Sequence, residues 1–124
     1  MIDYSIYQSL FGLQPSKSQL RMVEIAEGAV KAYLKKGIEK TTYDDIAKTS
    51  KVSRPLIIHY FPSYEVLIVF IAKYVRARFQ NFVIDKMKEK ASPLEQIEAY
   101  LDACFSWLVE KPEFTKIWMM FFFY

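Results

Sequence analysis

The fold is decided by residues 41–67, which read TTYDDIAKTSKVSRPLIIHYFPSYEVL. Thr42 can cap a short helix, and Asp45 stands at the third helical position, where its carboxylate can accept a hydrogen bond from the backbone amide of the cap residue. Ser53 can cap a second short helix, which accepts Pro55 in its first turn because the amides there have no helical partners. A short helix, a tight turn and a second short helix are the layout of a helix-turn-helix DNA reader.

The turn between the two helices is expected at Thr49, Ser50 and Lys51. Apolar side chains at helical spacing are expected to anchor the motif, namely Ile46, Ala47, Val52, Leu56 or Ile57, and Phe61. The motif can therefore pack on a core that neighbouring helices complete.

Helices are predicted on both sides of this motif. Ser16 and Gln19 resemble a capping box that opens a helix ending at Gly37. Its apolar face is expected at Leu20, Val23, Ala26, Val30, Tyr33 and Leu34. A long helix follows Pro62 and Ser63, with Leu67, Ile71, Tyr74, Val75, Phe79, Phe82 and Met87 along one side.

Two further helices are predicted after this long one. Ser92-Pro93-Leu94-Glu95 reads as a second capping box with proline at the first helical position. The helix that follows carries a stripe at i, i+3, i+4 and i+7, made of Ile97, Tyr100, Leu101, Cys104, Phe105 and Leu108. A last helix follows Pro112. The aromatic stripes of these helices are expected to form core or a dimer seam, with the lining of an effector pocket as an alternative for some of them. Cys104 is expected to fill core.

The segment Ile117–Tyr124 is apolar on every side, which a surface helix cannot be. It is shorter than the roughly 20 residues that span a bilayer. We therefore expect it to be buried, against a second copy of the chain or against further helices that would normally cover it.

Composition agrees with an all-α fold. The 124 residues are 52% hydrophobic and include only 3 Gly and 5 Pro, which is enough apolar material for a core and few turn formers. The single Cys104 cannot form an internal disulfide, and the first residues do not resemble a signal peptide, with its basic start, apolar run and small-residue cleavage site. A reducing cytoplasm fits these features best.

Charge is unevenly distributed along the chain. Residues 17–64 hold nine Lys or Arg and five acids, whereas residues 65–124 hold eight of each. The basic excess coincides with the predicted reader, as a phosphate-binding segment requires. An excess of this size is also common on ordinary solvated faces.

The motif resembles the reader of TetR-family transcriptional regulators. In that family Thr, three residues and Ile-Ala are followed by two residues and Ala-Gly-Val-Ser, then an aromatic-rich helix closing on Phe and a Ser-Lys-Glu-x-x-Leu-like start. The matching residues are Thr42, Ile46, Ala47, Val52, Ser53, Phe61, Ser63, Glu65 and Leu67. With the preceding helix, the resemblance covers about residues 17–70.

The resemblance implies a fold and a function. It implies an N-terminal arm at 1–16, a three-helix DNA-binding domain at 17–63, and a partial helical ligand-binding and dimerisation domain at 64–124. The implied function is that of a ligand-responsive repressor that binds a pseudo-palindromic operator in double-stranded DNA as a homodimer. Its effector would be a small apolar or aromatic molecule, and no cofactor, metal or catalytic residue is expected.

The residues expected to contact DNA are Thr42, Tyr43, Ser53, Arg54, Pro55, Leu56, His59, Tyr60 and Tyr64. Free amides at the two helix starts favour phosphate, although Thr42 and Ser53 can also act as caps alone. Arg54 can bind guanine O6 and N7 or fall back to phosphate, and Leu56 can touch a thymine methyl. His59 can equally be an ordinary surface or core histidine.

Departures from the family pattern support a second hypothesis. Lys51 stands where the family has the turn glycine, so it must adopt a positive φ at a cost of about 1 kcal/mol or reshape the turn. Ile58 and Tyr64 stand where the family usually has a tyrosine and a lysine that contact phosphate. The chain could then be a helical protein-interaction module that has lost DNA reading and binds a partner through its aromatic C-terminal face.

Two other classes have less support. One His, one Cys and no clustered carboxylate pair leave no metal set or catalytic triad, so an enzyme is not expected. A peripheral membrane role is suggested only by the Phe-rich end, and the preceding helices lack a strong basic face.

Overall fold

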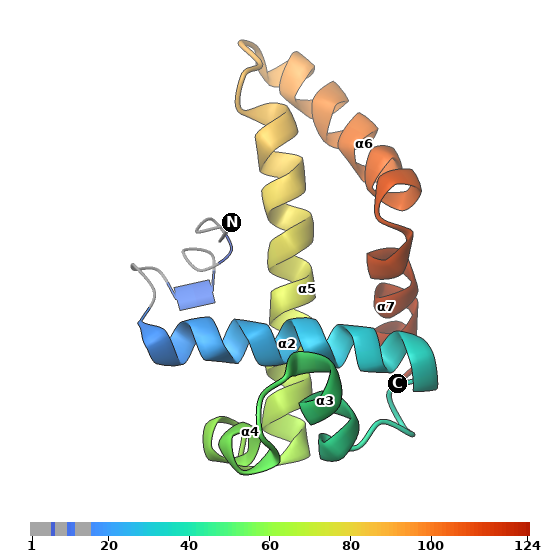
Figure 1. Ribbon diagram of the computed structural model, residues 1–124. Coiled ribbons are helices and arrows are strands. Elements are labelled where there is room, and N and C mark those ends of the chain that lie inside the picture. Colours follow the sequence, from blue (N-terminus) through green and yellow to red (C-terminus); the bar gives the residue numbers. More distant parts are fainter. Residues whose placement is uncertain (1–5, 7–9, 12–15) are drawn as a thin grey trace.

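Six helices carry the fold of this chain in the computed structural model, which describes Ile6, Leu10, Phe11 and residues 16–124. They are α2 (Lys17–Lys36), α3 (Tyr43–Ser50), α4 (Arg54–Tyr60), α5 (Tyr64–Met87), α6 (Pro93–Glu110) and α7 (Pro112–Phe123), as Figure 1 shows. No strand is present in these residues, so the predicted all-α class is confirmed. Most of the predicted arm at 1–16 lies outside the described residues.

Side-chain caps begin most of these helices, as predicted. Ser16 and Gln19 form a reciprocal capping box at α2, and Thr42 and Asp45 form another at α3. Serine hydroxyls accept from backbone amides at the starts of the next three helices, α4, α5 and α6. These caps satisfy amides that the helix itself leaves without partners, which is why the sequence locates the helix starts so closely.

The helices are arranged around α2 and α5, which cross each other (Figure 1). α3 packs along α2, and α4 packs against α3 and leads through residues 61–63 into the start of α5. α6 and α7 return along α5 and bring the end of α7 next to the end of α2. One contiguous core includes Ile46, Ile57, Leu67, Trp107 and Ile117, so residues on both sides of the predicted boundary at 63 and 64 share it.

At Gly28, α2 and α3 lie so close together that there is no room for a side chain. A Cβ atom built on Gly28 would lie 2.4 Å from the Ser50 Cβ and 2.6 Å from its Cα and N atoms. The adjacent Thr49 hydroxyl donates to the Gly28 carbonyl at 2.6 Å. Only glycine fits this contact, and the neighbouring hydrogen bond fixes α3 along α2.

The turn after α3 begins later than expected. α3 continues through Thr49 and Ser50, so these residues are helical, and Lys51 alone takes the left-handed conformation with φ 59°. Of the two outcomes expected for Lys51, the structure has the positive φ. Val52 is buried beneath the turn, as predicted.

α6 buries a different face from the apolar stripe that the sequence predicted as core or dimer seam. Its buried residues are Ala99, Ala103 and Trp107, whereas Phe105 in the predicted stripe is 69% exposed. The two alanines let α6 approach α5, and the Trp107 ring lies 5.6 Å from that of Phe79. The stripe is therefore not core within this chain, and its role as a dimer seam stays a prediction. Cys104, expected in the core, is half-buried.

The end of α7 is only partly buried. Ile117 is fully buried and Phe121 is half-buried, while Phe122 and Phe123 are 81% and 77% exposed. The expectation that the whole segment is covered is therefore not met by the chain's own helices. Among the described residues, no single helix is long and apolar enough to cross a bilayer, and α4 with α5 meets that test only as a pair bent by 80°.

Replacing Gly28 with alanine should destabilise the fold. The added methyl would overlap backbone atoms of Ser50, and overpacking of this kind costs about 1–3 kcal/mol, more than the gain of up to about 1 kcal/mol from better helix propensity. Urea denaturation should show a lower free energy of unfolding for Gly28→Ala. Lys31→Ala, at an exposed position one turn along α2, is the control and should be nearly neutral. A Gly28→Ala protein as stable as this control would contradict the close contact.

Replacing Lys51 with glycine should have the opposite effect. The left-handed conformation costs a side-chain-bearing residue roughly 1 kcal/mol, which glycine avoids. The free energy of unfolding should therefore rise by about that amount. Lys31→Gly, inside α2, should instead lose about 1 kcal/mol. Equal destabilisation by both substitutions would refute the positive φ at Lys51.

Candidate nucleic-acid interface

The starts of α3 and α4 present exposed hydroxyl groups with different hydrogen-bonding states. The Thr42 hydroxyl accepts from the Asp45 amide at 3.2 Å and donates to the Asp45 carboxylate at 3.0 Å. The Ser53 hydroxyl accepts from the Leu56 amide at 3.4 Å and donates to no atom of the described residues. Ser53 therefore keeps a free donor that an incoming phosphate oxygen could accept, whereas the Thr42 proton is already used.

Asp45 belongs to the framework of this surface. Lys36 donates to its carboxylate at 2.8 Å, and the Asp45 side chain is only 17% exposed. The bond from Lys36, followed by the bond from the Thr42 amide, lowers the pKa of Asp45 to about 2. This carboxylate is thus ionised at neutral pH, and it joins the end of α2 to the start of α3.

Arg54, the first residue of α4, contacts an acid on the neighbouring helix. Its Nη1 atom lies 3.4 Å from each carboxylate oxygen of Asp44, the second residue of α3. Both side chains remain more than half exposed. An exposed ion pair with one nitrogen at this distance contributes at most about 1 kcal/mol, so the guanidinium is free to exchange partners.

The rest of α4 divides into a buried and an exposed side. Ile57 is fully buried and anchors the helix, so of the two predicted anchors it is the principal one, while Leu56 is half-buried. Pro55 and His59 are exposed, as is Ile58 at 39%. An arginine followed by apolar side chains is thus the chemistry that α4 presents to solvent.

Tyr60 lies at the edge of this exposed side of α4. It is half-buried, and its ring centroid lies 5.2 Å from that of His59. Tyr60 also borders a cavity of about 360 Å³ whose other lining residues include Met22, Phe70 and Lys73. Part of its surface is therefore turned toward α2 and α5.

Tyr43 and Tyr64 are turned into the protein. The Tyr43 hydroxyl donates to the Phe61 carbonyl at 3.3 Å, and the Tyr64 hydroxyl lies 2.9 Å from the Ile38 carbonyl. Burial raises the pKa of both tyrosines. Their hydroxyl protons stabilise the α2–α3 loop and the end of α4, so the expected contacts with phosphate would need these bonds to break.

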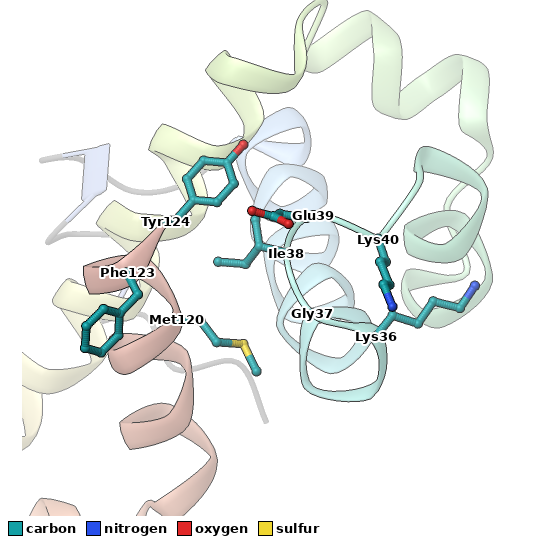
Figure 2. Close-up of a pocket in the computed structure, with 8 residues that line it drawn as sticks. All are labelled: Lys36, Gly37, Ile38, Glu39, Lys40, Met120, Phe123 and Tyr124. Atoms are coloured by element: carbon teal, nitrogen blue, oxygen red, sulfur yellow. The ribbon is translucent and has the colours of Figure 1, made fainter.

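The end of α7 packs beside the same loop. Met120, Phe123 and Tyr124 lie opposite residues 36–40 around a cavity of about 240 Å³ (Figure 2). Next to it, the Phe121 ring meets the ring of buried Tyr33 edge-on, with 6.4 Å between centroids. The C-terminal helix therefore touches the segment that supports the start of α3.

Two residues important to this surface were missed by the sequence analysis. Asp44 looked like one more solvated acid, because its partner Arg54 lies ten residues away on another helix. Gly28 gave no signal, because an isolated glycine inside a helix pattern does not reveal which element approaches it. Among the described residues, no three His, Cys, Asp or Glu side chains are grouped so that they could hold a metal ion.

Comparison with known proteins identifies the motif. Residues 25–69 match the family described as bacterial regulatory proteins, tetR family. The chain is 26% identical over 106 residues to the HTH-type transcriptional regulator LuxR of Vibrio harveyi, covering 86% of the chain and 50% of the relative. It is 26% identical over 111 residues to the HTH-type transcriptional regulator BetI of Rhizobium meliloti, covering 90% and 53%. No solved structure gives a significant match.

The matched region contains the surface described above, from the middle of α2 to the first turns of α5. A third relative, the uncharacterized HTH-type transcriptional regulator YuxN of Bacillus subtilis, is 27% identical over 93 residues, covering 75% of the chain and 32% of the relative. The chain spans about half the length of the first two relatives, and all three relatives carry the names of regulators rather than enzymes. The predicted resemblance is confirmed: residues 25–69 match the TetR family, and the relatives that the chain resembles are HTH-type transcriptional regulators.

Proposed function

We propose that the chain reads double-stranded DNA as part of a TetR-family transcriptional regulator and that α4 enters the major groove. The observation that carries the proposal is the exposed surface at the starts of α3 and α4. It combines the free hydroxyl of Ser53, the exchangeable guanidinium of Arg54 and the exposed side chains of Pro55 and Ile58. Phosphate contacts would set the position, and base contacts would set the sequence.

Each exposed residue has a contact that suits its chemistry. Ser53 and the amides of the helix starts suit phosphate oxygens, and Arg54 suits guanine O6 and N7. Leu56 and Ile58 suit thymine methyl groups, and His59 can reach a phosphate or a base edge. Thr42, Tyr43, Tyr60 and Tyr64 are then best placed as supports that orient the reader, since their hydroxyls are committed or they are half-buried.

The proposal includes a two-fold dimer. Two copies of α4 would lie about one DNA turn apart, roughly 34 Å, on a pseudo-palindromic site. The exposed stripe of α6, which includes Leu101, Phe105 and Leu108, offers apolar surface for such an interface. A surface of this kind on a single chain is typical of a protein interaction site.

The proposal also includes a small apolar or aromatic effector. A cavity of about 320 Å³ lies between α5, α6 and α7, lined by Phe79, Cys104, Trp107 and Trp118 among others. Its size and apolar lining suit a small ligand. The Trp107 indole N–H is buried with no hydrogen-bond partner in the described residues, so an acceptor on the ligand could satisfy it.

Two helices connect this cavity with the reader. α5 carries both Phe79, which lines the cavity, and Leu67, which shares the core with Ile57 of α4. α7 carries both Trp118, which lines the cavity, and Phe121, whose ring meets that of Tyr33. A ligand that binds one arrangement of these helices better than another would change the separation of the two α4 helices, by no more than its differential affinity allows. Repression follows if the ligand-free dimer has the separation that fits the operator.

A second candidate function is a protein-interaction module without DNA reading. The exposed apolar surface of α6 and the end of α7 favours it, as do the inward-turned Tyr64 and the isoleucine at position 58. This candidate predicts binding to a protein partner and none to duplex DNA.

Selection of bound duplexes from a random pool at low salt separates the two candidates. DNA reading predicts an enriched pseudo-palindromic motif, and affinity for it that falls steeply with salt. Arg54→Ala should weaken binding about 10-fold or more and relax the preference for one guanine. Arg76→Ala removes the same charge from an exposed site on α5 and serves as the control, which should change affinity little. Failure to enrich any motif would refute DNA reading and favour the interaction module.

A further inference from the structure

The contact between α3 and α4 suggests how the proposed reader avoids non-target DNA. We propose that Asp44 is a positioning residue that holds Arg54 away from phosphates until a guanine edge replaces the carboxylate. This inference rests on the proposed function. It assigns Asp44 a part in sequence discrimination, although an acid on a DNA-facing surface would by itself weaken binding.

The geometry of the Asp44–Arg54 ion pair is that of a weak contact that Arg54 can exchange for another acceptor. One guanidinium nitrogen is shared between both oxygens of Asp44 at 3.4 Å, with side-chain exposures of 55% for Arg54 and 63% for Asp44. Strong charge-assisted bonds are shorter, at about 2.7–2.9 Å, and a paired arginine and carboxylate often make two parallel ones. The contact is therefore sufficient to bias the side chain of Arg54 and too weak to retain it against a better acceptor.

The adjacent acid provides an internal comparison. Asp45 is only 17% exposed and is bonded to Lys36 at 2.8 Å and to the Thr42 amide at 2.9 Å. Its charge is compensated within the framework. Asp44 has no such shelter, and among the described residues its ion pair is with Arg54 alone. Its charge consequently faces the same solvent that an incoming DNA strand would occupy.

Phosphates and base edges would respond differently to this charge. A phosphate that binds Arg54 must approach within a few ångströms of the Asp44 carboxylate, and two negative groups at such a distance repel each other. Guanine O6 and N7 are uncharged acceptors that fit a guanidinium with two bonds. Asp44 therefore penalises phosphate binding more than guanine binding, which is discrimination through a repulsive element.

The test compares Asp44→Asn with Asp85→Asn in the full chain. Both substitutions remove one negative charge from an exposed acid that forms an ion pair, but Asp85 pairs with Lys88 at the far end of α5. Binding to a selected duplex and to a scrambled duplex would be measured across salt concentrations. Asp44→Asn should raise affinity for the scrambled duplex about 3- to 10-fold and steepen its salt dependence by about one phosphate contact, while the selected duplex gains less. Asp85→Asn should change both affinities less than about 2-fold.

A double variant tests whether Asp44 acts through Arg54. In the presence of Arg54, Asp44→Asn should reduce the selected preference for guanine at one position of each half-site. In an Arg54→Ala background that preference is already lost, so Asp44→Asn should leave the selected sequence unchanged. If Asp44→Asn instead removed a base preference that the Arg54→Ala protein still showed, Asp44 would read that base directly, which would overturn the inference.

The outcomes for Asp44 and for DNA reading are separable. If the wild-type chain selects a motif but Asp44→Asn behaves like Asp85→Asn, the inference fails and the proposed function stands. If neither the wild-type chain nor Asp44→Asn binds any duplex at low salt, both fail. Circular dichroism and urea denaturation of the variants should match the wild type, because an exposed pair contributes little to folding.

Discussion

The close contact between α2 and α3 at Gly28 is the constraint on which the rest of the helix-turn-helix depends. Backbone atoms of Ser50 occupy the space that any side chain at position 28 would need, and the Thr49 hydroxyl bonds to the Gly28 carbonyl. α3 therefore has one position along α2. Because the turn at Lys51 directly follows α3, that position also determines where α4 begins. The surface proposed to meet DNA is thus set by a helix contact that never touches it.

Hydrogen bonds between polar side chains and the backbone also hold α2, α3 and α4 together, and they leave few polar side chains of this region free to bind a ligand. Lys36 donates to the Asp45 carboxylate. Tyr43 donates to the Phe61 carbonyl, and Tyr64 donates to the Ile38 carbonyl. The two tyrosine hydrogen bonds are partly buried, so breaking either one would leave a sheltered polar group without a partner. The polar groups that remain available to a ligand lie on α4 and at its start, and the principal hydrogen-bond donors among them are Ser53 and Arg54. The two neighbouring acids, Asp44 and Asp45, accordingly have different roles, one exposed beside Arg54 and one structural.

Local signals made much of this fold predictable, and non-local contacts made the rest unpredictable. Ser16, Thr42, Ser53 and Ser92 locate helix starts because a cap acts within three residues of itself. The orientation of α6 could not be read in the same way, since that helix has two apolar faces. Its larger side chains suggested the core, but Ala99 and Ala103 allow the closer approach to α5. The inward hydroxyl of Tyr64 and the pairing of Asp44 with Arg54 likewise depend on which helices meet, and not on sequence neighbours.

The central claim is that the starts of α3 and α4 form the surface that meets DNA. Backbone-amide NMR of the chain during titration with duplex DNA at low salt tests this most directly. The account predicts the largest shift changes at residues 42–45 and 53–59, with smaller ones along α6. Changes concentrated on the exposed stripe of α6, with the amides at the starts of α3 and α4 unmoved, would contradict it.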